Sequence, residues 1–99
     1  MTTQETNQVK PLFALGKTVA TPGALVVMQG IDISPLSLLS RHQCGDWGDL
    51  DDEDKAENET SLKENFRIFS SYNLAEKIKL WVITEADRSA TTILLPEEY

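Results

Sequence analysis

Three runs of strand-forming residues close the chain, and they restrict its fold more than any other feature. They cover residues 66–72, 77–84 and 90–95, and apolar side chains recur along them with a period near two. The connections 73–76 and 85–89 are too short for a crossover between parallel strands. The sequence therefore predicts a three-stranded antiparallel β-meander.

Two helix-start signals precede this meander. Thr21-Pro22 and Ser34-Pro35 each place a hydroxyl cap before a proline at the first helical position. They predict short helices over 24–29 and 35–42. A third helix is expected over 51–65, because acidic side chains crowd its first turn and stabilise a helix N-terminus.

The domain organisation follows from length and composition. A chain of 99 residues suits one domain, and residues 1–10 are polar enough to predict a flexible tail. Residues 11–99 are then a single α+β domain, with two or three helices packed on the meander. Thr18 and Val19 favour an additional N-terminal strand.

The cellular setting is also an expectation from composition. The first ten residues lack the charged-then-apolar layout of a secretory signal, and no apolar run approaches the ~18 residues of a membrane span. The single cysteine, Cys44, excludes a disulfide within the chain and is expected to be chemically inert. We expect a cytoplasmic protein with no membrane partner.

The run 77–84 predicts two different faces for the meander. Trp81 and Ile83 lie on the face opposite to the expected core. Large apolar side chains on an open face need a cover, which either the Leu12-Phe13 segment or a second subunit would supply. The sequence thus predicts a homodimer formed through the Trp81 face.

Residues 41–50 contain many of the chain's chemically distinctive side chains. They include its only histidine, its only cysteine, a tryptophan, two glycines and two aspartates. In one interpretation this is a small polar site, where His42 carries a proton and Asp46 or Asp49 orients it. In the other it is a loop between helices, ended by Gly45 and filled by a core tryptophan. The binding residues expected here are Arg41, His42, Asp46, Trp47 and Asp49.

A second polar group, Glu85, Asp87 and Arg88, lies in the turn after the middle strand run. As a site, it offers a guanidinium able to hold a carboxylate through two hydrogen bonds, and Asp87 and Arg88 are binding candidates. As an ordinary turn, it needs no ligand. The catalytic candidates of the whole chain are His42, Asp46, Glu85, Asp87 and Arg88.

The formal net charge of −7 comes from one segment. This segment, residues 46–59, holds eight acidic residues and a single basic residue, Lys55, and the charges of the rest of the chain sum to zero. Such a segment repels phosphate backbones, so direct nucleic-acid binding is not expected. The spacing lacks the alternating ligands and central glycine of a calcium loop, so no metal or cofactor is expected either. The acidic residues are Asp46, Asp49, Asp51, Asp52, Glu53, Asp54, Glu57 and Glu59.

These features favour a non-enzymatic interaction protein that binds a protein partner through its acidic segment. The alternative is a small hydrolase or nuclease-like toxin built on the catalytic candidates. An enzyme would need His42 and the turn 85–88 in one pocket, whereas an interaction protein can hold them apart. A third hypothesis, mimicry of DNA phosphates, requires acids spread at regular intervals over one surface.

Several segments together carry a family likeness: Arg41-His42, residues 45–50, 67–72 and 84–88, and residues 94–99. They resemble a group of small proteins of bacterial plasmids and integrated elements, labelled plasmid-related or type I restriction subunit M. The resemblance covers about residues 13–99 and implies a bacterial, mobile-element setting, without a particular activity or catalytic residue. A methyltransferase does not fit, because the chain lacks room for a doubly wound sheet and has no glycine-rich loop.

Overall fold

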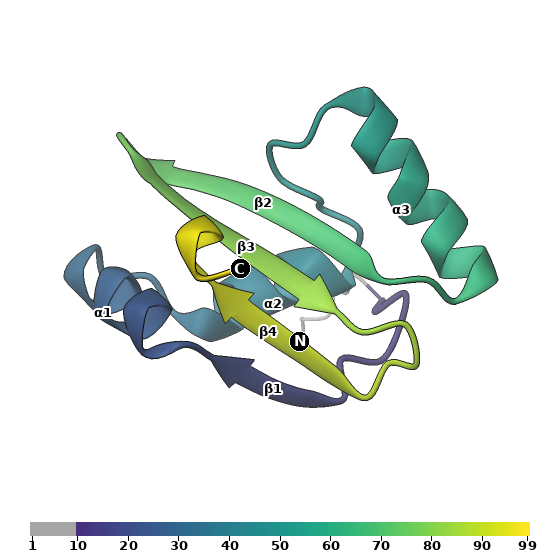
Figure 1. Ribbon diagram of the computed structural model, residues 1–99, viewed down its shortest axis with the longest axis horizontal. Helices are drawn as coiled ribbons and strands as arrows, with labels where there is room; N and C mark the ends of the chain where they lie inside the picture. The colour runs from purple at the N-terminus through teal and green to yellow at the C-terminus, as the bar shows by residue number, and fades with distance from the viewer. Residues whose placement is uncertain (1–9) are drawn as a thin grey trace, which may run out of the picture.

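The computed structural model describes residues 10–99, so the predicted tail before Lys10 lies outside the described residues. After one short strand, three consecutive helices are followed by three consecutive strands, as Figure 1 shows, and this arrangement confirms the predicted α+β class. The elements, in chain order, are β1 (Lys17–Ala20), α1 (Pro22–Gly30), α2 (Pro35–Gln43), α3 (Asp52–Glu64), β2 (Ile68–Ala75), β3 (Ile78–Thr84), β4 (Ala90–Leu94) and the 3-10 helix η2 (Pro96–Glu98).

The strands form one sheet in the order β1-β4-β3-β2. β2, β3 and β4 pair antiparallel, as the short connections predicted. The expected three-stranded antiparallel sheet is nevertheless wrong, because β1 adds a fourth strand parallel to β4 and makes the sheet mixed. The direction of β1 is set by pairing Lys17 with Ala90, far along the chain, and no local pattern encodes such a contact.

Both helix-start signals act as predicted. The Thr21 hydroxyl accepts a hydrogen bond from the Ala24 N–H at 3.1 Å, and the Ser34 hydroxyl accepts one from the Leu36 N–H at 3.2 Å. In each helix the following proline occupies the first turn, where its missing N–H costs nothing. The caps and prolines thus fix where each helix begins.

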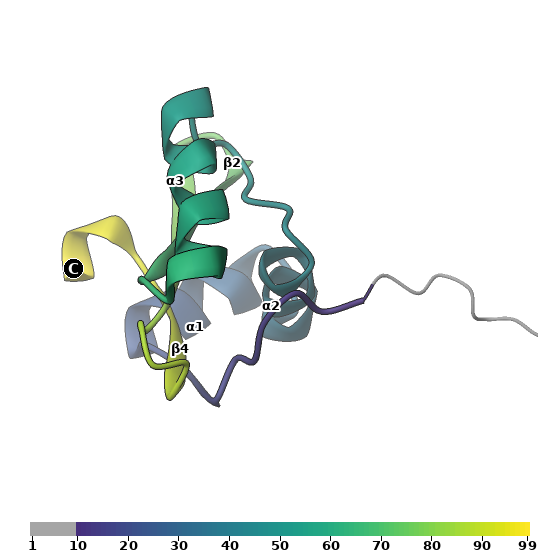
Figure 2. The same cartoon turned by 90° about the vertical axis from the view of Figure 1, so that its right-hand side faces the viewer.

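The third helix also begins on a side-chain cap. Asp51 accepts a hydrogen bond from the Asp54 N–H at 2.8 Å, and Asn65, in a left-handed conformation with φ 61°, ends the helix. Only Asn58 and Ser61 are buried in α3. This helix therefore has no apolar face and lies beside the outer edge of β2 rather than over the sheet (Figures 1 and 2).

One face of the sheet carries the core. Figure 2 shows α2 on this side and the C-terminal end of the chain on the other. Burial of apolar side chains between α1, α2 and the strands supplies the main stabilisation of the domain. The buried core residues are Ala24, Met28, Leu38, Leu39, Tyr72, Leu80, Val82 and Ile93.

The opposite face has only a partial cover. Trp81 makes edge contacts with Phe69 and Tyr99, with ring centroids 5.0 and 5.8 Å apart. The covering residue thus comes from the end of the chain, after η2, and not from the Leu12-Phe13 segment.

The segment predicted to cover Trp81 lies against α2 instead. The Leu12 N–H donates to the Gln43 carbonyl, and the Gln43 side-chain amide donates to the Phe13 carbonyl, both at 2.8 Å. These two bonds satisfy the carbonyl and the side-chain amide of the last residue of α2, and so hold residues 12–13 against that helix.

Among the helices of residues 10–99, none is by itself long and apolar enough to cross a membrane. The pair α1 and α2, bent by 106°, reaches such a length and composition only when both helices are taken together.

Candidate functional site

His42 lies in the last turn of α2 and has no exposed surface. Its Nδ1 atom lies 2.6 Å from the Ser70 hydroxyl on β2, and its Nε2 atom lies 2.9 Å from the Thr84 hydroxyl on β3. The imidazole therefore joins α2 to two strands. Its partners are hydroxyls, in place of the carboxylates Asp46 and Asp49 that the sequence suggested.

The hydrogen-bond chain beyond His42 fixes its tautomer. Thr91 donates to the Leu15 carbonyl at 2.8 Å, since a carbonyl oxygen can only accept. Thr84 must then donate its proton to Thr91, 2.7 Å away, and accept the Nε2–H of His42. The Nδ1 atom accepts from Ser70. His42 is thus a neutral imidazole with both nitrogens bonded.

Burial lowers the pKa of His42 from 6.5 to about 4, because no solvent is present to stabilise the charged ring. Two aromatic rings complete its enclosure: Phe13 and Trp47 make edge contacts with the imidazole at centroid distances of 5.2 and 6.0 Å. At neutral pH His42 is uncharged and out of reach of any solute. This geometry supports a structural role.

Arg41 and Asp46 form an ion pair on the surface. The Arg41 Nε atom lies 2.6 Å from an Asp46 carboxylate oxygen, and the guanidinium stacks 4.4 Å above the centroid of the Tyr72 ring. The guanidinium holds the pKa of Asp46 below its usual value. Each partner is about half exposed, so the pair contributes little stability but remains reachable by a ligand.

Trp47 is 5% exposed and fills the space beside Phe13, with the two ring centroids 6.4 Å apart. Its indole N–H donates to the Glu59 carboxylate at 3.2 Å, which ties the loop before α3 to the helix itself. Trp47 is therefore a core residue with one polar edge, and not an exposed binding surface.

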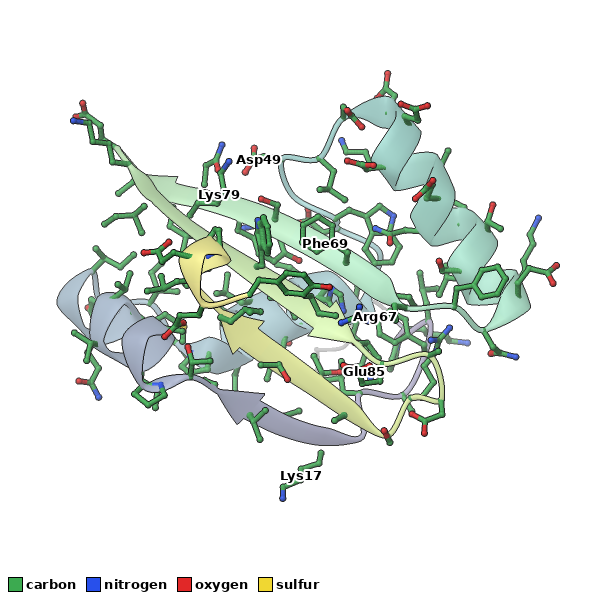
Figure 3. All side chains as sticks on the ribbon, viewed as in Figure 1. Lys17, Asp49, Arg67, Phe69, Lys79 and Glu85 are labelled. Carbon is green, nitrogen blue, oxygen red and sulfur yellow. The ribbon has the colours of Figure 1, made fainter. Side chains whose placement is uncertain are left out.

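Residues 47–49 run along the outer edge of β2. Gly48 forms a parallel bridge with Ser71, whose N–H donates to the Trp47 carbonyl at 3.2 Å. The Asp49 N–H donates to the Ser71 carbonyl at 2.6 Å, and the Asp49 carboxylate accepts from the Asn73 N–H at 2.8 Å. Asp49, labelled in Figure 3, thus acts as an edge cap for the sheet.

The Arg88 guanidinium binds four backbone carbonyls. It donates to Ser61 at 2.9 Å, Phe66 at 2.7 Å, Glu85 at 3.2 Å and Ala86 at 3.1 Å. These contacts fasten the end of α3 and the loop after it to the β3–β4 turn. The fork expected to hold a ligand is occupied by the protein's own backbone.

The two acidic members of this turn have separate partners. The Glu85 carboxylate lies 3.6 Å from the Arg67 Nε atom, and Asp87 accepts a hydrogen bond from the Ser89 N–H at 3.0 Å. Hydrogen bonds from Ser89 lower the pKa of Asp87, which is fully exposed. Asp87 thus behaves as a turn-forming residue.

Phe13 lies close to one member of each predicted polar cluster: His42 of residues 41–50 and Arg88 of the turn 85–88. The Phe13 ring centroid is 5.2 Å from the His42 ring centroid and 5.8 Å from the Arg88 guanidinium carbon. Across residues 10–99 no two catalytic candidates bind each other through their side chains, and no three histidine, cysteine or acidic side chains converge where a metal could be held. The catalytic assignment stays a prediction.

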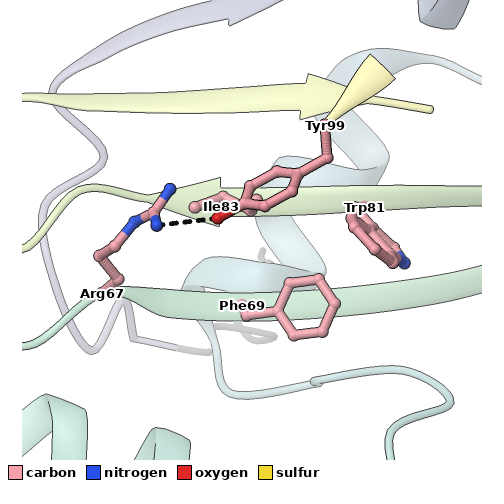
Figure 4. A pocket seen from close by; sticks show the side chains of 5 residues that line it. All are labelled: Arg67, Phe69, Trp81, Ile83 and Tyr99. Atoms are coloured by element: carbon pink, nitrogen blue, oxygen red, sulfur yellow. Dashed lines mark hydrogen bonds between the residues drawn. The ribbon is translucent and has the colours of Figure 1, made fainter. Parts of the chain in front are cut away.

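An aromatic pocket on the open sheet face was not anticipated from the sequence. It has a volume of about 250 Å³ and is lined by Arg67, Phe69, Trp81, Ile83 and Tyr99 (Figure 4). The Arg67 guanidinium donates to the Tyr99 hydroxyl at 3.0 Å. The strand alternation placed Trp81 and Ile83 together, but nothing in it indicated that the last residue would form a wall.

All eight acidic residues of the acidic segment have exposed side chains. Asp51, Asp49, Asp46 and Glu59 also have the capping or pairing roles given above. The remaining four acids, all on α3, have no partner among residues 10–99 and face solvent.

Comparison of the chain with protein-family models, curated proteins and solved structures finds no match.

Proposed function

We propose that this chain is a non-enzymatic interaction protein that binds a basic region of a protein partner through its acidic segment, residues 46–59. The observation that carries the proposal is the exposure of α3, whose only buried residues are Asn58 and Ser61. The carboxylates on its outer surface are not needed to pack the helix. A surface of this kind is suited to attract and orient a positively charged partner.

The burial and hydrogen bonding of the catalytic candidates support a binding protein over an enzyme. His42 is enclosed and fully hydrogen-bonded, and Arg88 is held by carbonyl groups. A hydrolase needs a base and an electrostatic stabiliser that meet at one reacting atom. No observation in the described part of the chain favours the hydrolase or toxin over a binding protein.

The biological setting is part of the proposal. The likeness to plasmid and integrated-element proteins suggests a bacterial cytoplasmic protein that modulates host defence or plasmid maintenance. The partner is a protein, since the acidic segment repels the phosphates of nucleic acids and lipid headgroups alike.

A charge-neutralised variant tests the proposal. Asp52→Asn, Asp54→Asn and Glu57→Gln together remove exposed charges from α3, while Asp51 is kept because it caps the helix. The purified proteins are used to capture partners from a lysate of a plasmid-bearing bacterium. We expect a basic protein that is retained by the wild type, released by added salt, and not retained by the variant.

The matched control removes the same number of charges elsewhere. Asp32→Asn, Glu76→Gln and Glu97→Gln are exposed positions outside the acidic segment. This control should retain the partner as well as the wild type does. If the neutralised variant and the control bind equally, the acidic segment is not the binding surface and the proposed function fails.

A further inference from the structure

The two edges of the sheet differ. β2 is one edge, and its outer side is satisfied by Asn58, Asp49 and the bridge from Gly48. β1 is the other edge, and β4 is the strand with which it pairs. An edge strand with unpaired backbone groups is a template for another strand. Among residues 10–99, the β2 edge is covered and the β1 edge is open.

The register shows which groups of β1 face outward. The Lys17 N–H donates to Ser89 and the Thr21 N–H to Ile93, both at 3.0 Å, so odd-numbered positions of this strand point toward β4. Because successive residues of a strand alternate, the N–H and C=O groups of Thr18 and Ala20 point away from the sheet. Within residues 10–99 these outward groups have no hydrogen-bond partner.

An apolar groove follows this edge. It has a volume of about 140 Å³ and lies between β1 and the start of α2. One large apolar side chain that lines it is poorly covered, since Val19 is 41% exposed. The groove is lined by Thr18, Val19, Ala20, Pro35, Leu39 and Ile93.

We propose that β1 pairs with β1 of a second copy of this chain, antiparallel and about a two-fold axis through Val19. Thr18 of each copy then lies opposite Ala20 of the other, and the outward N–H and C=O groups of both residues are bonded. The two four-stranded sheets join into one. The Val19 side chains meet at the axis.

Self-complementarity favours a second copy over an unrelated peptide. A two-fold axis uses the same short strand twice, and the register is set by its ends: Gly16, with φ 66°, and Thr21-Pro22, where α1 begins. Lys17 of each copy lies opposite the uncharged Thr21, so like charges do not meet. Lys17 itself projects away from the sheet (Figure 3).

The charge distribution supports the same arrangement. α3 lies beside β2, at the edge opposite to β1 (Figure 1). Pairing through β1 therefore leaves the two acidic segments at the outer ends of the joined sheet, where salt screens their repulsion. The Trp81 face predicted from the sequence adjoins β2, so a dimer formed there brings the two acidic helices nearer to each other.

Opposite charges at Val19 give a direct test. The full chain carrying Val19→Lys, and separately Val19→Glu, is examined by sedimentation equilibrium over a concentration series, beside the wild type. We expect a reversible dimer for the wild type and monomers for each variant, because like charges meet at the axis. An equimolar mixture of the two variants should restore the dimer. A monomeric wild type at every concentration overturns the proposal, as does dimerisation of either variant alone.

A backbone variant gives an independent test. Thr18→Pro removes an outward N–H and leaves the β1–β4 ladder intact, since prolines are tolerated where the N–H of an edge strand faces solvent. It should weaken the dimer at least about tenfold. Thr18→Val, which keeps the backbone donor, should dimerise like the wild type. Loss of the dimer in Phe69→Ser, with Val19 variants unaffected, would place the contact on the Trp81 face and refute this assignment.

Discussion

Asn58 binds Phe69 through both ends of its side-chain amide. Its Nδ2 atom donates to the Phe69 carbonyl at 2.6 Å, and its Oδ1 atom accepts from the Phe69 N–H at 3.1 Å. A side chain of α3 thus takes the place of a neighbouring strand at the β2 edge. This pair, together with the contacts of Arg88 and Trp47, holds a helix without an apolar face beside the sheet.

Replacement of Asn58 should be costly although the residue is polar. Asn58→Ala leaves both backbone groups of Phe69 without their partner, so we expect the free energy of unfolding to fall by about 1–3 kcal/mol in urea titrations. Glu57→Ala, at the exposed neighbouring position, should change it by less than about 0.5 kcal/mol. Equal effects of the two changes would show that the amide is not what holds α3.

The buried imidazole should make stability depend on pH. The pKa of His42 is about 4 in the folded chain, against an ordinary value of 6.5, so the unfolded chain binds more protons between these values. The contribution of neutral His42 to the free energy of unfolding is complete above pH 6.5. It falls by up to about 3 kcal/mol as the pH is lowered to 4. Urea titrations at several pH values measure this loss.

His42→Gln provides the comparison for that measurement. Glutamine can still hydrogen-bond but does not titrate, so the difference in unfolding free energy between variant and wild type should narrow as the pH falls from 6.5 to 4. Acidic residues titrate equally in both proteins and cancel. A difference that stays constant over this range would mean that His42 is not held neutral by the fold.

Replacement of Gly48 and of Gly30 by alanine should change the stability of the domain in opposite directions. At Gly48, with φ 78°, an added Cβ would collide with the Ser71 carbonyl and the Tyr72 ring, so Gly48→Ala should destabilise the domain by more than about 1 kcal/mol. At Gly30, the last residue of α1, a Cβ meets nothing within 4 Å. Gly30→Ala should raise the thermal midpoint, with a gain of about 0.5–1 kcal/mol. Calorimetry of both variants distinguishes these outcomes.

Arg88→Lys, although it conserves the charge, should destabilise the domain. A lysine at this position would present a single ammonium where the guanidinium fork reaches four carbonyls on two segments. We expect Arg88→Lys to lower stability by about 1–2 kcal/mol and to increase amide hydrogen exchange near Ser61 and Phe66. Unchanged exchange in this region would assign Arg88 to the surface and reopen its role as a ligand-binding group.

The elements that could be predicted depend on neighbours in sequence. Thr21 and Ser34 cap their helices through residues two or three positions ahead, and the β2–β3–β4 meander follows from short connections. Asp51 caps α3 in the same local manner. These signals are visible in the chain because cause and effect lie within a few residues.

The rest depended on contacts between distant residues. The sequence singled out His42, but its partners Ser70 and Thr84 could be named only once two strands were placed beneath α2. Tyr99 covers Trp81 because η2 turns the chain back over β3, a reversal that no periodic pattern indicates. The unusual composition of residues 41–50 thus pointed to the candidate site, whereas the hydrogen-bond partners of His42 could be identified only from the tertiary structure.

The parallel pairing of β1 with β4 bears on how the chain acquires its fold during synthesis. Lys17 is synthesised well before its partner Ala90, so the sheet closes last between its first and last strands. Until then β1 and the β4-facing side of β3 both lack their neighbouring strand. The sheet is therefore expected to close only after β4 has been synthesised, whereas the β2–β3 hairpin can form earlier.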